Sequence, residues 1–158
     1  MRLRFIPVII VLALSGGCGG NEDRVTSVSD DDPRMNAAIA KARETVDTFI
    51  AALQSPRTGQ SEFTVKMAFT DGEHTEHMWL SPVSYDGKIF HGTVQNDPAN
   101  VANVKLGQAA SIEPSKISDW MYVENGKLVG GYTVRALREI MPPSERAEFD
   151  RTAPFRIE

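Results

Sequence analysis

The sequence feature that most constrains the fold is the Asn125-Gly126 dipeptide, which lies between two apolar runs. Asn-Gly in this setting is the strongest short-range signal of a β-hairpin, because a type I′ turn needs two residues with positive φ. With these residues as the loop, Glu124 pairs with Lys127, and Tyr122 lies opposite Val129. The segment around the dipeptide is therefore predicted to form two paired strands.

Both sides of this predicted hairpin are apolar. Trp120 and Tyr122 share one side, and the other side carries Met121, Val123 and Leu128. A ribbon that is apolar on both sides is buried on both. Trp120 also lies opposite Gly131, where a large ring can cover the bare backbone of a strand glycine. We therefore expect the hairpin to lie at the centre of the domain.

The first seventeen residues have the three-part layout of a secretory signal peptide. Arg2 and Arg4 give a positive start, residues 5–14 form an apolar run, and small residues follow up to Gly17. An apolar run of this length is too short to span a bilayer as a helix. We predict that residues 1–17 are a leader that is removed on export.

Cys18 is the chain's single cysteine, so an intrachain disulfide is excluded. The segment Leu14-Ser15-Gly16-Gly17-Cys18 resembles a bacterial lipobox, although its leucine lies four residues before the cysteine instead of three. In proteins with such a signal the cysteine is acylated, with palmitate among the acyl groups, and becomes the first mature residue. Combined acyl chains anchor a protein stably, whereas one chain binds only marginally. We expect lipid attachment at Cys18, with an ordinary secreted protein as the alternative.

The predicted location follows from the same segment. The residue after the cysteine is Gly19 and not aspartate, and this resembles the class of lipoproteins that is sorted to the outer membrane. In a cell with two membranes the protein would then lie on the periplasmic face of the outer membrane. We therefore expect an exported protein of the cell envelope.

The predicted mature chain is acidic. Without the two leader arginines, fifteen basic residues remain against twenty-one acidic ones, a net charge of −6. Nucleic-acid binding depends largely on Lys and Arg side chains that neutralise phosphates. Direct adsorption to anionic lipid needs the same positive charge. The composition argues against both partners and leaves the lipid anchor as the predicted contact with the membrane.

Composition divides the chain into three segments. Residues 1–17 are the leader, residues 18–32 are a lipidated and flexible tether rich in Gly, Ser, Asp and Asn, and residues 33–158 are one domain. Asp32 before Pro33 is predicted to cap a helix instead of binding a metal. Apolar residues at three- and four-residue steps extend this helix to about Leu53.

The rest of the domain alternates strands with short helices. Period-two alternation predicts strands at about 63–70, 73–83, 88–94 and 109–112, followed by the hairpin. One helical turn is expected within residues 98–105, residues 133–141 fit a helix or a strand, and residues 145–149 fit a last helix. The predicted fold is α+β. It has a strongly bent antiparallel sheet of five or six strands, forming a partial barrel, with a long N-terminal helix and short C-terminal helices.

Several stretches, taken in order, resemble the YegJ-like family, also called domain of unknown function 2314. They are Glu76-His77-Met78-Trp79-Leu80, Phe90-His91-Gly92-Thr93-Val94-Gln95-Asn96-Asp97-Pro98, Val104-Lys105-Leu106-Gly107-Gln108, Ile117-Ser118-Asp119-Trp120-Met121-Tyr122 and Gly130-Gly131-Tyr132-Thr133-Val134-Arg135. The resemblance spans about Met35 to Phe149, and Gln108 stands where an acidic residue is expected. It implies a shared compact α+β domain with no established activity.

The sequence Glu73-His74-Thr75-Glu76-His77 comes closest to a metal site. Two histidines three residues apart share a face on a helix, but the preceding Asp71-Gly72 turn favours a strand. On a strand, residues three apart point to opposite faces. His91 would join them only through an unusual bend. We predict no metal and no cofactor.

Asp119, beside Trp120, is the candidate general acid or base. A carboxylate near a buried aromatic ring can have a raised pKa, but no second carboxylate or nucleophile accompanies it at a recognisable spacing. The structural alternative is that Ser118 and Asp119 satisfy backbone N–H groups, with Arg135 as a partner of Asp119. Gly130 to Thr133 before a helix suggests an anion site, but the nucleotide-binding glycine patterns are absent.

The residues left as candidates for ligand binding are mainly aromatic. Aromatic and Arg side chains dominate binding hot spots, and the candidates are Trp79, Tyr85, Asp119, Trp120, Tyr132 and Arg135. We assign no catalytic residue. We expect a non-catalytic, lipid-anchored envelope domain that binds a protein or another envelope ligand. The alternative is a small envelope hydrolase that uses Asp119, with His77.

Overall fold

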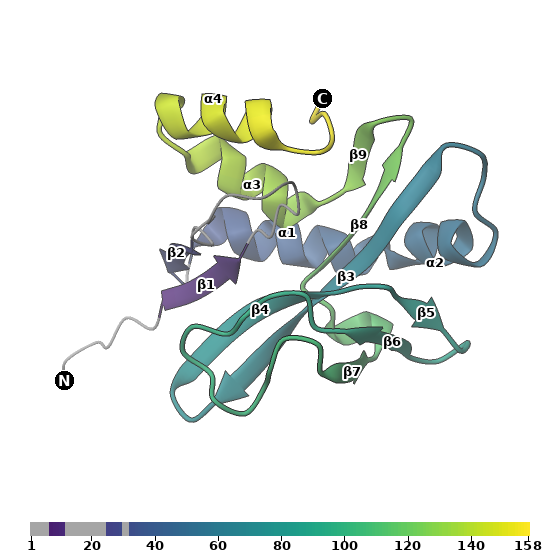
Figure 1. Ribbon diagram of the computed structural model, residues 1–158, viewed down its shortest axis with the longest axis horizontal. Helices are drawn as coiled ribbons and strands as arrows, with labels where there is room; N and C mark the ends of the chain where they lie inside the picture. The colour runs from purple at the N-terminus through teal and green to yellow at the C-terminus, as the bar shows by residue number, and fades with distance from the viewer. Residues whose placement is uncertain (1–6, 12–24, 30–31) are drawn as a thin grey trace.

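The computed structural model describes residues 7–11, 25–29 and 32–158 (Figure 1). Its elements in chain order are β1 (Pro7–Val11), β2 (Val25–Ser29), α1 (Pro33–Glu44), α2 (Val46–Gln54), β3 (Gln60–Asp71), β4 (His74–Leu80), β5 (Ser84–Tyr85), β6 (Phe90–Thr93), β7 (Ala109–Ile112), the 3-10 helix η1 (Pro114–Lys116), β8 (Asp119–Glu124), β9 (Lys127–Gly130), α3 (Tyr132–Ile140) and α4 (Pro143–Thr152). Strand β1 lies within the predicted leader and β2 within the predicted tether. Cys18 lies outside the described residues.

The described strands form two sheets in place of the single bent sheet that was predicted. The larger sheet has the order β2-β1-β4-β3-β8-β9, and the smaller has the order β5-β6-β7. Paired strands are antiparallel, except that β1 runs parallel to β4. A bridge between Leu80 and Val94 links the two sheets, and the described strands do not close into a barrel. Proline lacks the N–H that a ladder needs, so Pro82 stops β4 from continuing and the chain turns into the smaller sheet.

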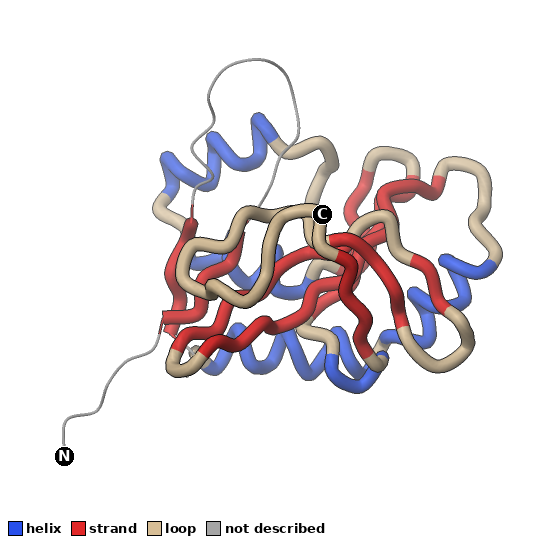
Figure 2. The backbone as a smooth tube through the Cα atoms, turned by 60° about the horizontal axis from the view of Figure 1, so that its bottom comes forward, coloured by secondary structure: helices blue, strands red, loops and turns tan. Residues whose placement is uncertain are grey.

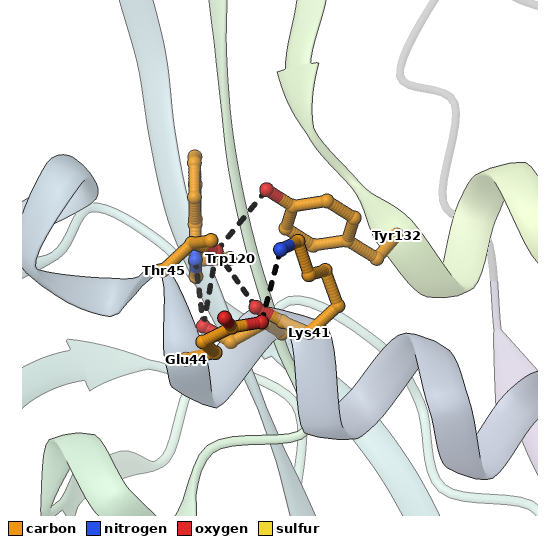
Figure 3. A network of polar contacts seen from close by, with 6 residues as sticks. Lys41, Glu44, Thr45, Trp120 and Tyr132 are labelled. Carbon is orange, nitrogen blue, oxygen red and sulfur yellow. Dashed lines mark hydrogen bonds and ion pairs between the residues drawn. The ribbon is translucent and has the colours of Figure 1, made fainter.

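The prediction of one long N-terminal helix is wrong, because α1 and α2 are separated at Thr45. The indole Nε1 of Trp120 donates to the carbonyl oxygen of Ala42 at 2.9 Å. The Thr45 hydroxyl donates to the Lys41 carbonyl at 2.7 Å and lies 3.1 Å from the Tyr132 hydroxyl, as Figure 3 shows. The indole therefore occupies the Ala42 carbonyl, which the next helical turn would use, whereas the Lys41 carbonyl still accepts from the Thr45 N–H at 3.1 Å.

The N-cap of this helix was predicted correctly. The Asp32 carboxylate accepts from the backbone N–H groups of Arg34 and Met35, and Pro33 is the first helical residue. A side-chain oxygen that accepts from the first free N–H groups is the usual way to begin a helix.

The hairpin register is confirmed. Glu124 pairs with Lys127 and Tyr122 with Val129, and Asn125 has the positive φ of 52° that the turn requires. The expectation that the Trp120 ring covers Gly131 is wrong, because the ring lies against Gly130 and the Leu128 side chain lies against Gly131. The Trp120 carbonyl accepts from the Gly131 N–H at 2.8 Å, and a Cβ on Gly130 would lie 2.5 Å from the ring. Only glycine leaves room for the ring there.

Both faces of the larger sheet are buried at its centre, as the two apolar sides of the hairpin predicted. On one face, Phe49 of α2 packs with Trp120 and Tyr122 and with buried residues of the smaller sheet. On the opposite face, Trp79 and Leu128 of the sheet pack with Val134 of α3, Phe149 of α4 and Phe155. In Figure 2 the helices lie at the periphery and the strands at the centre.

The segment after Thr133 is helical, which decides between the two readings left open by the sequence. Helix α3 begins after Gly131, whose φ of 61° is left-handed. Helix α4 is longer than predicted, and residues 98–105 form bends and irregular backbone without a helix. Among the described residues, no helix has the length and apolar character needed to cross a membrane.

Candidate functional site

The centre of the larger sheet carries a buried polar cluster on the face that α3 covers. Lys66 of β3 pairs with Trp79 of β4 on one side and with Asp119 of β8 on the other. Residues paired across neighbouring strands share a face, so these three side chains lie together. Lys66 and Asp119 are both fully buried. Alternation along β3 by itself would place Lys66 on the solvent side, but the side chain is buried.

Thr133 joins the two charged groups. The Lys66 ammonium donates to the Thr133 hydroxyl at 2.8 Å, and this hydroxyl donates to Asp119 Oδ2 at 2.5 Å. The ammonium also lies 4.3 Å from the centre of a Trp79 ring, which attracts a cation. Lys66 therefore has a hydroxyl acceptor, an aromatic face and a nearby carboxylate.

Asp119 holds the first turn of α3. Its Oδ1 accepts from the N–H groups of Trp120 and Tyr132 at 2.8 and 3.1 Å, and its Oδ2 accepts from the N–H of Thr133 at 2.8 Å. The chain's own carboxylate thus occupies the anion position that the Gly130 to Thr133 segment suggested. With the Thr133 hydroxyl, four donors saturate a side chain that has no exposed surface.

Burial shifts the pKa of each charged group in the direction that favours its neutral form. Burial lowers the pKa of Lys66, and the charge of Asp119 partly opposes this effect. Burial also raises the pKa of Asp119, against the effects of Lys66 and the hydrogen bonds from Thr133 and Trp120. Desolvation disfavours any charged form, and the opposite charge of the partner partly offsets this effect at each group.

His77 and Ser118 extend the cluster toward β4. His77 Nδ1 lies 2.6 Å from Ser118 Oγ, and Ser118 is almost fully buried. Burial lowers the pKa of His77 to about 4, with the positive charges of Lys66 and Arg43 acting in the same direction. His77 is therefore neutral at physiological pH, and it shares one hydrogen bond with Ser118.

The three histidines lie apart, as the strand assignment predicted. His74 is exposed on β4, and His91 lies in the smaller sheet between Asp86 and Ser111, 2.9 Å from an oxygen of each. Within the part of the chain that the structure describes, no group of three or more His, Cys, Asp or Glu residues is placed to hold a metal.

The aromatic candidates are mainly core residues. Trp79 and Trp120 are 5% and 1% exposed. The half-buried Tyr132 packs edge-on against Trp120 with ring centres 5.7 Å apart. Tyr85 is half-buried against Phe90, with ring centres 4.9 Å apart. These rings stabilise the domain and present little surface to a ligand.

Arg135 does not pair with Asp119. Its guanidinium donates to the carbonyls of Gly130, Leu128 and Glu158 at 2.7 to 2.9 Å. Arg135 therefore ties the end of β9 and the C-terminal residue to α3, and the charged neighbour of Asp119 is Lys66.

Sequence reasoning missed Glu76 as well as Lys66. Glu76 is fully buried, and its carboxylate accepts from the backbone N–H groups of Ala99, Asn100 and Val101 at 2.8 to 3.3 Å. The available signal was the position of Glu76 in β4, two residues before the buried Met78. A charged residue in phase with buried neighbours needs internal partners.

These features define a small α+β domain with an internal cluster of charged and polar residues. A family model described as "Uncharacterized protein conserved in bacteria (DUF2314)" matches residues 32–156. The chain belongs to this family, as its resemblance to the YegJ-like sequences predicted.

Two relatives are similar over most of this chain. "Uncharacterized protein YegJ" of Escherichia coli (strain K12) is 35% identical over 148 residues, which cover 94% of this chain and 95% of that protein. "Putative ankyrin repeat protein NMB1133/NMB1171" of Neisseria meningitidis serogroup B is 36% identical over 131 residues, which cover 78% of this chain and 52% of the relative. The chain thus matches about half the length of the second relative. No solved structure matches the chain significantly.

Proposed function

We propose that the protein is a non-catalytic domain, anchored to the cell envelope through a lipid on Cys18, that binds a protein or another envelope ligand. The saturation of Asp119 carries the non-catalytic part of this proposal. A general acid or base must reach the proton that it transfers. Asp119 is fully buried, and both of its oxygens are occupied by donors that belong to the fold.

Two further observations support anchoring and binding. The leader and the cysteine that follows it have the layout of an exported lipoprotein. The Neisseria relative, about twice as long as the matched segment, is described as a putative ankyrin repeat protein. Repeat proteins of that kind present extended binding surfaces, which suits a domain that works by association.

The anchor is tested by Cys18→Ser in the full-length chain. We expect the wild type in the membrane fraction and the variant in the soluble fraction, because the variant has no thiol to acylate. Ser15→Ala is the matched control, since it changes the same segment and leaves the cysteine. Membrane retention of Cys18→Ser would exclude lipid anchoring at this residue.

Binding is tested by cross-linking the wild-type protein in intact cells and identifying what it captures. We expect recovery of an envelope component in amounts that exceed those captured by an unrelated lipoprotein. Recovery of none, together with turnover of an envelope substrate that is lost in Asp119→Asn, would contradict the proposal.

A small envelope hydrolase that uses Asp119 with His77 is the second candidate. The 2.6 Å contact between His77 and Ser118 favours it, because a serine beside a neutral histidine is the beginning of a nucleophilic site. The burial of Ser118 opposes it. This candidate requires that His77→Ala abolishes an activity while thermal stability is unchanged.

A further inference from the structure

The edge of β4 that faces away from β3 has backbone groups that can pair with another strand. Trp79 directs its backbone away from β3: its carbonyl accepts from Gln95 N–H at 3.0 Å, and its N–H donates to Asn96 Oδ1 at 3.1 Å. Successive strand residues turn their N–H and C=O groups to opposite sides. His77, two residues earlier, therefore presents its backbone groups to the same edge as Trp79. Residues 93–96 cover the edge only near the end of β4.

Strand β1 occupies the remainder of this edge. It runs parallel to β4, with Ile9 opposite Glu76 and Ile10 opposite His77. The sequence of β1 is Pro-Val-Ile-Ile-Val, which is uncharged and mainly β-branched. Such residues are enriched in strands, so the structure identifies the kind of segment that this edge accepts.

The occupant belongs to the predicted leader. If residues 1–17 are removed on export, the backbone groups of His77 lose this partner. A strand edge with unpaired N–H and C=O groups is a template for pairing with another chain.

The edge is also fixed in position before any partner arrives. The Glu76 side chain is held on one face by the N–H groups of residues 99–101, and the His77 side chain contacts Ser118 on the other face. A surface that is already ordered loses less conformational entropy on binding. Both residues at the centre of the edge are therefore preorganised.

We propose that the β4 edge at Glu76 and His77 is a strand-addition site for an extended, uncharged, β-branched segment of another envelope protein, added parallel to β4. In this binding mode the main chain gives affinity and alternate side chains give specificity. The inference rests on the proposed function, because it requires that the leader is removed and that the domain works by binding.

The test uses the full-length gene expressed in bacteria, with the product extracted in detergent and its N-terminus determined by mass spectrometry. The probe is a fluorescein-labelled peptide of residues 6–12 with two lysines added at each end for solubility. The control peptide carries Ile9→Pro, which removes a strand N–H. Binding is followed by fluorescence anisotropy.

The protein variants are His77→Pro and the matched control His77→Ala. Both lose the imidazole, but only proline lacks the N–H and obstructs pairing at the edge. We expect His77→Ala, which loses only the contact with Ser118, to bind the probe slightly more weakly than the wild type. His77→Pro should bind it at least about tenfold more weakly than His77→Ala, as loss of a backbone hydrogen bond implies. The Ile9→Pro peptide should not compete.

Several outcomes would overturn the proposal. They are equal binding of the two peptides, absence of probe binding, and equal weakening in His77→Pro and His77→Ala. Dimerisation that His77→Pro abolishes would make a second copy of the chain the occupant. Probe binding only after deletion of residues 25–29 would make it the chain's own tether. If His77→Pro fails to fold, the peptide pair still decides.

Failure of this inference is distinguishable from failure of the proposed function. Retention of residues 1–17 in the purified protein would contradict both, because the leader would then keep its place on the edge. A processed protein that captures an envelope partner equally well as wild type and as folded His77→Pro would contradict strand addition alone.

Discussion

Asp119 and Glu76 are both fully buried carboxylates, but they lie on opposite faces of the larger sheet and are satisfied differently. Glu76 accepts from the N–H groups of three successive residues in the loop at 99–101. Asp119 accepts from three N–H groups and a hydroxyl, and through that hydroxyl it is joined to Lys66. Backbone amides alone are therefore sufficient to bury a carboxylate in this fold. Asp119 also has the charged Lys66 beside it. Loss of the Asp119 carboxylate would therefore leave a buried positive charge without compensation.

The largest effect is expected for Asp119→Ala. The substitution leaves the Lys66 ammonium buried without its compensating charge. It also leaves two N–H groups at the start of α3 and the N–H of Trp120 in β8 without an acceptor. Removing one member of a buried charge pair costs about 3 to 5 kcal/mol of unfolding free energy. Urea denaturation followed by circular dichroism measures it.

Lys66→Met is the matched control for that experiment. It removes the other charge but leaves Asp119 with its four donors, so its loss of stability should be smaller. Equal losses for the two variants would show that Asp119 depends on the lysine as much as the lysine depends on Asp119.

Acid sensitivity should come next, and should arise from the face that carries the cluster. The ordinary pKa of histidine is 6.5, whereas His77 in the folded protein has a pKa of about 4. Between these values the unfolded chain binds more protons, so stability is complete above pH 6.5 and declines as pH falls to about 4. The full effect is up to about 3 kcal/mol.

His77→Ala isolates this contribution, because it removes the titrating ring and leaves Lys66 and Arg43 in place. Its unfolding free energy, measured by urea denaturation at several pH values, should depend less on pH between 6.5 and 4 than that of the wild type. Identical slopes would place the acid sensitivity elsewhere.

The smallest effect is expected for Glu76→Gln, at about 1.5 kcal/mol, the scale of a buried donor left without an acceptor. The amide oxygen of glutamine still accepts from the loop at 99–101, but its NH₂ group faces N–H donors. Thermal melting measures the change. A loss as large as that of Asp119→Ala would mean that the negative charge of Glu76, and not its hydrogen bonds, holds the loop.

The features that sequence alone predicted correctly depend on neighbouring residues. The Asn125-Gly126 turn sets the register of β8 and β9, and the Asp32-Pro33 pair sets the start of α1. Both follow from local backbone conformation, which a short stretch of sequence specifies. The strand Ala109–Ile112 was likewise predicted with its observed bounds.

The features that were missed depend on residues distant in the chain. The break between α1 and α2 requires Trp120, 78 residues away from Ala42. The burial of Lys66 requires Asp119 and Thr133, and the burial of Glu76 requires the loop at 99–101. A lysine or glutamate in an alternating strand predicts a solvent face unless its partners are known, and pairing partners are not readable from one sequence. The candidate site was therefore predicted in part: Asp119 was identified, but its charged neighbour was assigned to Arg135 and not to Lys66.

The bond from the Trp120 indole to Ala42 also bears on how the chain folds in time. It closes a loop that contains α2 and strands β3 to β7, so this bond at the break between α1 and α2 forms only when the hairpin has docked. Contacts of such large sequence separation slow folding, because loop closure must precede the contact that rewards it. We therefore expect the bond between Trp120 and Ala42 to form late in folding. Because the Trp120 indole donates this bond, its fluorescence should change when the bond forms.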